Sequence, residues 1–259
     1  MNAARLRHLA DRNAPLLAAL LLLASWEIGC RALSVPSFVL PTPSAIVQAV
    51  QSFTGAQLLR HFMATVQVVA AGFVAAIVVS VPVAIMITHS RLLSRTLVPL
   101  LVVIHSTPIV AVAPIIVVAL GAGALPRVVI TCLITFFPLV ISLVTGLRST
   151  PEEIVELSRS LRAPRQRELW LVRMPFAVPH IFSALKVCIT LAVIGAVVGE
   201  FVTSEDGLGY LILFSTSMLR MPQSFVALGV LVVLSLLLYQ LIDWIERRWF
   251  AWSIPRSQR

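Results

Sequence analysis

The chain has 259 residues, of which 59% are apolar and only 12% are charged. Soluble domains are about 45–50% apolar and about 25% charged, so this composition excludes an ordinary soluble protein. It also excludes intrinsic disorder, because disordered chains are poor in apolar residues. What remains is a polytopic membrane protein, with room for about five to seven helices at about 20 residues per crossing.

Basic residues outnumber acidic ones, 20 against 11, which gives a formal net charge of +9. On a soluble chain this excess would indicate nucleic acid. In an apolar chain, the excess of basic residues instead indicates which loops face the cytoplasm. We therefore expect no nucleic-acid partner. The three cysteines lie far apart and predict neither a metal site nor a disulfide framework.

The first predicted span is the weakest. Residues 14–33 begin with an apolar run, but Glu27 and Arg31 follow within it. A cleaved signal peptide is the alternative, given the arginines ahead of the run. No small-x-small cleavage site follows, so a retained first helix is favoured.

Five further runs are long enough to cross a bilayer, and their apolar cores contain one charged residue, Lys186. The predicted spans cover residues 65–88, 97–120, 128–147, 176–201 and 223–245. We therefore predict an all-α fold with about six transmembrane helices, forming a single transmembrane domain over residues 1–259.

Arginines predict the orientation of these spans. If the N-terminus is cytoplasmic, the inner segments are residues 1–13, 89–96, 148–175 and 243–259, and they hold 15 arginines. The outer side then receives only four. Because basic residues concentrate in cytoplasmic loops, we expect both termini in the cytoplasm.

The inner segment 148–175 is longer and more patterned than a connector requires. We predict a helix over residues 152–163, which ends there because the residue before Pro164 resists the α region. Thr150 suits its N-cap and, with Glu153, forms a capping box. A second short helix is predicted over residues 165–174.

The first of these helices is amphipathic. Ile154, Leu157 and Leu161 share one face, and that face needs cover. It could lie on the membrane surface or dock into another protein. Acidic residues interrupt the basic pattern of a surface-lying helix, so docking is favoured.

This segment resembles the EAA loop in the membrane subunits of binding-protein-dependent ATP-binding-cassette (ABC) importers. That pattern is Glu-Ala-Ala, three residues, Gly, nine residues and then Ile-x-Leu-Pro. Glu156-Leu157-Ser158 takes the first position, Arg162 that of the glycine, and Val172-Arg173-Met174-Pro175 the last. The spacing is kept, but the triplet and the glycine depart from the pattern.

Further fragments resemble the nitrate/sulfonate/taurine branch of this family, and they occur in the family's order. They are Leu40-Pro41-Thr42-Pro43-Ser44-Ala45, Ser106-Thr107-Pro108 with Ala113-Pro114, Gly121-Ala122-Gly123, Phe136-Phe137-Pro138, Gly199-Glu200 and Gly207-Leu208-Gly209-Tyr210.

The resemblance implies one permease half of a type I importer in a bacterial inner membrane. It implies two separate ATPase subunits that bind ATP and Mg²⁺, a second permease copy in a homodimer, and a periplasmic or lipid-tethered solute-binding protein. The implied substrate is a small solute, either an anion such as taurine, a sulfonate or nitrate, or a pyrimidine-type vitamin precursor.

The resemblance also implies two groups of functional residues. The residues expected to couple to the ATPase are Glu152, Glu153, Glu156, Leu157, Arg159, Ser160, Leu161, Arg162 and Ala163. Those expected along the translocation pathway are His105, Ser106, Thr107, Ser183, Lys186, Thr190 and Glu200.

Several of these residues have ordinary alternatives. Glu156 could form an i,i+3 pair with Arg159. Lys186 could attract an anionic substrate or extend toward the inner headgroups. Glu200, expected at the outer interface, could be a solvated acid, and His105 could be a packing residue.

The chain has no chemistry of its own for hydrolysis. A P-loop needs Lys followed by Ser or Thr, and Lys186, the only lysine, precedes Val187. Metalloprotease and Gly-x-Ser-x-Gly patterns are also missing, so we predict no catalytic residue, no metal site and no enzyme activity.

Two other classes compete with an importer permease. An ion-coupled secondary transporter usually has buried carboxylates and inverted repeats, and neither is expected in the second to fifth spans. A membrane scaffold without transport activity is the third class. Co-purification with an ATPase would separate the importer from both. Dependence of transport on ATP hydrolysis, rather than on a proton gradient, would separate the importer from the secondary transporter.

Overall fold

The structure is a computed structural model, and it describes residues 3–203 and 205–253. All regular elements in this part of the chain are helices, which confirms the predicted all-α fold. The long helices are α1 (Ala3–Ala32), α3 (Gly55–His89), α4 (Arg91–Ser106), α5 (Ile109–Leu120), α6 (Ala124–Arg148), α9 (Met174–Thr203) and α11 (Met221–Trp249). The shorter ones are α2 (Pro43–Ala49), α7 (Glu152–Ser160), α8 (Arg165–Arg167) and α10 (Leu208–Ser217).

Four helices of the described residues are long and apolar enough to cross a membrane. They are Gly55–His89, Ala124–Arg148, Arg165–Thr203 and Met221–Trp249. The pair α4 and α5 makes a fifth if it is one span. Residues 14–32 of the first predicted span lie in α1. The side chains of Pro15 and Leu16, which belong to this span, are outside the described residues. The predicted total of six spans therefore stays a prediction.

The predicted span 97–120 is bent rather than straight. The axes of α4 and α5 differ by 94° across the break between Ser106 and Ile109. Thr107 is extended, with ψ of 125°, because the ring of Pro108 excludes the α conformation from the residue before it. The sequence shows this proline, but proline alone does not distinguish a small kink from a right-angled turn.

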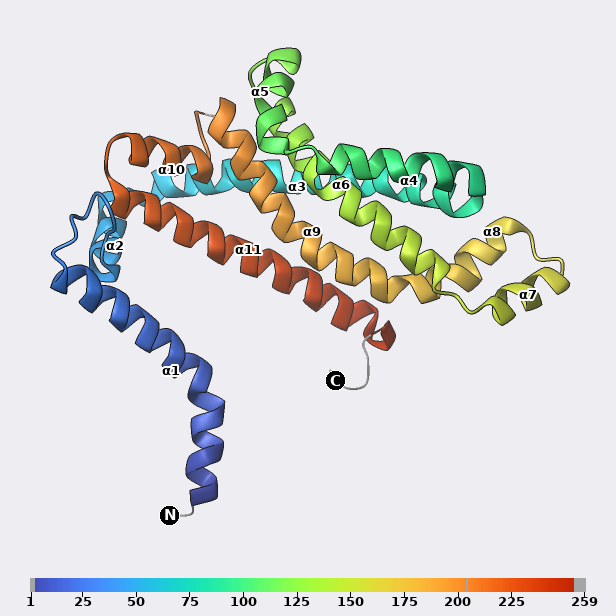
Figure 1. Cartoon of the computed structure of the whole chain (residues 1–259), viewed down its shortest axis with the longest axis horizontal. Helices are drawn as coiled ribbons and strands as arrows, with labels where there is room; N and C mark the ends of the chain where they lie inside the picture. The colour runs from blue at the N-terminus through green and yellow to red at the C-terminus, as the bar shows by residue number, and fades with distance from the viewer. Residues whose placement is uncertain (1–2, 204, 254–259) are drawn as a thin grey trace. The chain divides into compact units, whose positions relative to one another are not determined.

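The chain divides into two compact units, residues 1–59 with 211–229 and residues 60–210 with 230–259. In the second unit, α6 and α9 lie side by side (Figure 1). A Cβ atom at Gly195 would lie 2.8 Å from the Cα atom of Thr131, so only glycine permits this close approach. Small residues play the same part in other membrane helix pairs.

A buried apolar cluster joins α3, α4 and α6 in the second unit. Ala84 and Ile87 of α3 and Leu101 of α4 pack with three residues of α6, namely Val140, Leu143 and Val144. A neighbouring cluster of Leu147, Leu169 and Ala177 joins the end of α6 to the start of α9. These clusters fix the helix ends from which the inner loop 148–175 projects.

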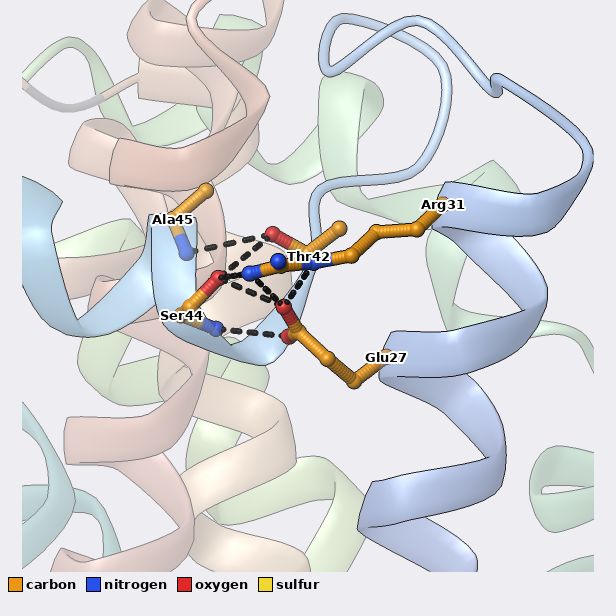
Figure 2. A network of polar contacts seen from close by, with 5 residues as sticks. All are labelled: Glu27, Arg31, Thr42, Ser44 and Ala45. Carbon is orange, nitrogen blue, oxygen red and sulfur yellow. Dashed lines mark hydrogen bonds and ion pairs between the residues drawn. The ribbon is translucent and has the colours of Figure 1, made fainter.

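In the first unit, a carboxylate of α1 holds the start of α2 (Figure 2). Glu27 accepts hydrogen bonds from the Ser44 backbone N–H (3.0 Å) and hydroxyl (2.8 Å), and it pairs with Arg31. Thr42 caps α2 by accepting from the Ala45 N–H at 3.2 Å, and Pro43 occupies the first turn. The Leu-Pro-Thr-Pro-Ser fragment is therefore a helix N-terminus anchored to α1.

Among residues 3–203 and 205–253, three helices end at a non-glycine residue with positive φ, namely Ser34 (50°), Arg162 (52°) and Leu219 (57°). Each end has the two hydrogen bonds of a Schellman motif, for example Ala163 N–H to Ser158 O and Arg162 N–H to Arg159 O after α7. Glycine is the usual residue here, so these ends are conformationally costly.

Candidate functional site

The inner loop 148–175 contains two helical pieces, and its details differ from the sequence prediction. Helix α7 begins at Glu152 after Pro151, which is the N-cap, and no side chain caps it. The predicted capping box is therefore wrong, since the Thr150 hydroxyl is buried without a hydrogen-bond partner in the described residues.

Helix α7 ends at Ser160, three residues earlier than predicted, because Arg162 turns into the left-handed region. The predicted second helix consists of α8 followed by a π-helical segment, Glu168–Arg173, which runs directly into α9. Short π-helical segments within α-helices are frequent at functional sites.

The apolar face predicted for α7 is exposed. Leu157 and Leu161 are 60% and 74% exposed, and Ile154 also faces outward. The buried side chains are instead Val155 and Ser158, which turn toward the rest of the unit. The described part of this chain therefore leaves the leucine face of α7 without cover.

The remaining predicted coupling residues lie around this face. Their side chains are exposed except for that of Ala163, which is half-buried: Glu152, Glu153, Glu156, Arg159, Ser160 and Arg162. The alternative pairing of Glu156 with Arg159 does not occur, because Arg159 pairs with Glu168 at 3.6 Å.

Glu168 organises the return from the loop to α9. It accepts hydrogen bonds from the Arg173 side chain at 2.9 and 2.7 Å, and Arg173 also donates to the Leu147 carbonyl at 3.2 Å. The hydrogen bond from Arg173 to Leu147 thus joins the last turn of α6 to the π-helical segment before α9, and the half-buried ion pair with Glu168 holds the Arg173 side chain in place. Neither residue was predicted to be functional, because their five-residue spacing suits a π-helix rather than an α-helix.

Three of the predicted pathway residues lie together at the bend between α4 and α5. His105, Ser106 and Thr107 line a cavity of about 340 Å³, together with Phe136 and Phe137 of α6. The His105 ring stacks on the Phe137 ring with centroids 4.3 Å apart. The two hydroxyls donate to carbonyls of their own helix, so the cavity is predominantly apolar and aromatic.

The other pathway residues of α9 do not line this cavity. Ser183 is exposed, and the Thr190 hydroxyl donates to the Val187 carbonyl at 2.7 Å. The Lys186 side chain is paired rather than free. Its Nζ lies 2.5 Å from Asp243 and 2.7 Å from Glu246, both on α11.

These two acids complete an ion cluster near the C-terminus of α11. Arg247 pairs with Asp243 at 2.6 Å, and the Ser253 hydroxyl donates to Glu246 at 3.0 Å. The sequence analysis did not identify Asp243 and Glu246, although their i,i+3 spacing puts both on one face of a helix. The signal that could have found them is Lys186 itself, because a single charge in an otherwise apolar span needs an oppositely charged partner.

Glu200 is buried, with an exposed fraction of 1%, so the alternative of a solvated acid is wrong. It is also a buried carboxylate in the predicted fifth span, where none was expected. Its carboxylate accepts from the Gly209 N–H at 2.7 Å. The two preceding N–H groups, of Gly207 and Leu208, donate to His61 (3.2 Å) and Thr65 (2.8 Å).

The Glu200 contacts explain the Gly-Leu-Gly fragment. Three consecutive N–H groups at the start of α10 have side-chain acceptors, which satisfies groups that a helix start leaves open. A Cβ atom at Gly207 would lie 2.3 Å from the Glu200 carboxyl carbon. The Glu200 side chain therefore occupies the space that any larger residue at position 207 would need.

Comparison with known proteins agrees with this architecture. The family model described as "Binding-protein-dependent transport system inner membrane component" matches residues 76–251. The chain belongs to this family. It is therefore the translocation subunit of an ABC importer and a multi-pass membrane protein rather than an enzyme. Membership implies an ATPase and a solute-binding protein as partners.

Individual relatives cover nearly the whole chain. A probable ABC transporter permease protein of Haemophilus influenzae is 36% identical, over 93% of this chain and 97% of the relative. The riboflavin transport system permease protein RibX of Chloroflexus aurantiacus is 36% identical (90% and 88%). The formylaminopyrimidine transport permease protein ThiX of Halalkalibacterium halodurans is 30% identical (92% and 95%).

Among solved structures, an inward-facing structure of the MetNI methionine ABC transporter has a similar fold. Its TM-score is 0.67 at 20% identity, and the match covers 75% of this chain and 96% of that chain. This similarity supports the fold of the permease.

Proposed function

We propose that this permease forms the pathway of an importer as a homodimer, with each copy docking α7 into a separate ATPase. ATP and Mg²⁺ bind to the two ATPase subunits and not to this chain. Closure of the ATPases moves the paired α7 helices and changes the side of the membrane to which the pathway opens. A periplasmic or lipid-tethered binding protein delivers the solute from outside.

The observation that carries this proposal is the exposed apolar face of α7. Burying a leucine side chain is worth about 1.5–3 kcal/mol, so Leu157 and Leu161 favour a partner that covers them. The acidic first turn argues against a lipid surface as that cover. A protein groove on the ATPase suits both the apolar face and the charged rim.

The proposed orientation has both termini in the cytoplasm of a bacterial cell and the chain in the inner membrane. The excess of arginines in residues 89–96 and 148–175 supports it. A cysteine introduced at Leu157 is expected to react with a membrane-impermeant maleimide only in inside-out vesicles. Reaction from the outside of intact cells would contradict this orientation.

For the substrate, we favour a planar nitrogen heterocycle of the flavin or pyrimidine type over a small anion. The cavity at the bend has stacked aromatic rings, and no Lys or Arg among the described residues lines it. Lys186 is already paired with two carboxylates. The relatives named for riboflavin and formylaminopyrimidine are 36% and 30% identical, against 25% for the Escherichia coli taurine permease.

The test is uptake by the complete transporter in lipid vesicles. The permease, its ATPase and its binding protein are reconstituted, and uptake of labelled riboflavin, formylaminopyrimidine, taurine and nitrate is measured. Uptake of a heterocycle that needs ATP hydrolysis is the expected result. Uptake driven by a proton gradient without ATP would contradict the importer mechanism, and uptake of taurine or nitrate alone would contradict the heterocycle.

A further inference from the structure

A basic cavity lies beside α7 in the second unit. Its volume is about 600 Å³, and it is lined by five arginines but only two glutamates. The arginines are Arg91, Arg95, Arg148, Arg159 and Arg173. They come from α4, from the ends of α6 and α7, and from the segment before α9, so the fold concentrates them from four parts of the sequence.

Three of these arginines have partners within the chain. Arg148 donates to the Ile87 carbonyl (3.3 Å) and to the Ser94 hydroxyl (3.0 Å). Arg159 and Arg173 share Glu168.

Arg91 and Arg95 make no ion pair or side-chain hydrogen bond within the described residues. They are exposed and stand four residues apart on one helix face, where like charges repel each other. The glutamates of this cavity, Glu152 and Glu156, also form no ion pair with any described residue. The cavity therefore has an excess of positive charge that an anion would neutralise.

Thr150 provides a second, independent observation about this cavity. This residue lines the cavity and is only 6% exposed, yet its hydroxyl has no hydrogen-bond partner in the described part of the chain. Buried hydroxyls in proteins are nearly always hydrogen-bonded. A ligand oxygen that enters the cavity would give this hydroxyl an acceptor after a small movement of its side chain.

The cavity belongs to the inner membrane surface in the orientation proposed above, and the inference rests on that proposal. Its lining comes from the point where α3 gives way to α4 and from the end of α6. Leu92, next to Arg91, is 75% exposed, which suits contact with acyl chains. Basic pockets between helices at this depth bind the headgroups of anionic lipids.

We propose that this cavity binds the phosphate group of an anionic phospholipid of the inner leaflet. Arginine side chains suit this ligand, because their planar fork matches phosphate oxygens in pairs. Free inorganic phosphate offers the same chemistry, but it would make no use of the exposed Leu92. A lipid held here links α4 to α7 and so makes coupling depend on lipid composition.

The test measures lipid binding to the full-length permease in detergent by native mass spectrometry. Phosphatidylglycerol is titrated against phosphatidylcholine, and inorganic phosphate is titrated separately. The variant Arg91→Gln/Arg95→Gln is expected to bind phosphatidylglycerol about thirtyfold more weakly than the unmodified chain. The control Arg220→Gln/Arg248→Gln removes two exposed charges elsewhere and is expected to bind normally.

Three outcomes would overturn the proposal. They are equal retention of both lipids, equal loss of binding in the control variant, and binding of inorganic phosphate without phosphatidylglycerol. If an acidic surface of the ATPase occupies the cavity instead, the Arg91/Arg95 variant would lose assembly with the ATPase and keep its lipid binding. That outcome would also contradict the proposal. This readout needs no transport, so its failure is distinct from a failure of ATP-dependent uptake.

Discussion

At the scale of single residues, the end of α7 depends on a conformation that arginine adopts at a cost. Arg162 has a φ of 52°, at the position where the EAA pattern has glycine. Helix α7 ends where it would end with glycine at position 162, because the backbone hydrogen bonds of the Schellman motif do not involve the side chain. The departure from the family pattern therefore changes the local stability of the loop and leaves its geometry intact.

Arg162→Gly is expected to stabilise the end of α7 by about 0.5–1 kcal/mol, since glycine has no left-handed penalty but loses more entropy on folding. Amide hydrogen exchange of residues 155–165 in the purified permease should slow by about two- to fivefold. Arg165→Gly, in α8, serves as the control and should not slow exchange. Faster exchange in the Arg162 variant would show that the side chain itself holds the turn.

Gly207 combines a positive φ with a closely packed neighbour. Its φ is 120°, and a Cβ atom would meet the Glu200 carboxyl group at 2.3 Å. Gly207→Ala is expected to destabilise the permease by about 2–5 kcal/mol through backbone strain and overpacking. Thermal unfolding in detergent measures this, and Gly229→Ala, with open space around it, should have little effect.

At the scale of helices, the ion cluster around Lys186 connects the first half of α9 to the C-terminal part of α11. Lys186 pairs with two carboxylates there, Arg247 shares one of them, and the side chain of Glu246 is only 8% exposed. Removing one partner of such a cluster leaves an uncompensated buried charge, which typically costs about 3–5 kcal/mol. The cluster is thus expected to stabilise the fold more than to attract substrate.

Lys186→Met should therefore lower the melting temperature of the permease strongly, and adding Glu246→Gln should recover most of the loss. Arg248→Met, an exposed charge in the same helix turn, is the control. The alternative role in the pathway makes the opposite prediction, with normal stability and a raised KM for uptake. Measuring melting and uptake on the same preparations separates the two roles.

The helices themselves could be predicted from the sequence because lipid imposes a simple rule on composition. Long apolar runs predicted α6, α9 and α11 to within four residues at each end, whereas α3 begins at Gly55, ten residues before the predicted span. The ends of α7 and the bend at Thr107 could not be derived from the sequence. The residues that determine them, Pro151, Pro108 and Arg162, are each compatible with more than one local backbone conformation. The partners of Lys186 and Glu200 lie 57 and 9 residues away, and pairing over such distances follows from packing and not from periodicity.

At the scale of the whole molecule, the coupling role proposed for α7 requires a firm connection between this helix and the spans. Both ends of the loop are tied to spanning helices, since Arg173 donates to the Leu147 carbonyl and Ser149 to the Phe176 carbonyl. Buried packing of Leu147, Leu169 and Ala177 supports the same junction. A force applied to α7 therefore acts on α6 and α9 together.

This arrangement makes Glu156 a site where coupling can be disturbed without damaging the fold. Its side chain is exposed and forms no ion pair within the described residues, so Glu156→Lys should leave membrane insertion and thermal stability unchanged. Reversing its charge beside Leu157 should weaken ATPase docking, and we expect ATP-dependent uptake to fall at least tenfold, equivalent to about 1.4 kcal/mol. Glu205→Lys, an exposed acid outside the inner loop, is the matched control, and uptake is measured in vesicles alongside co-purification of the ATPase. Normal uptake together with normal assembly in the Glu156 variant would mean that this part of α7 does not face the ATPase.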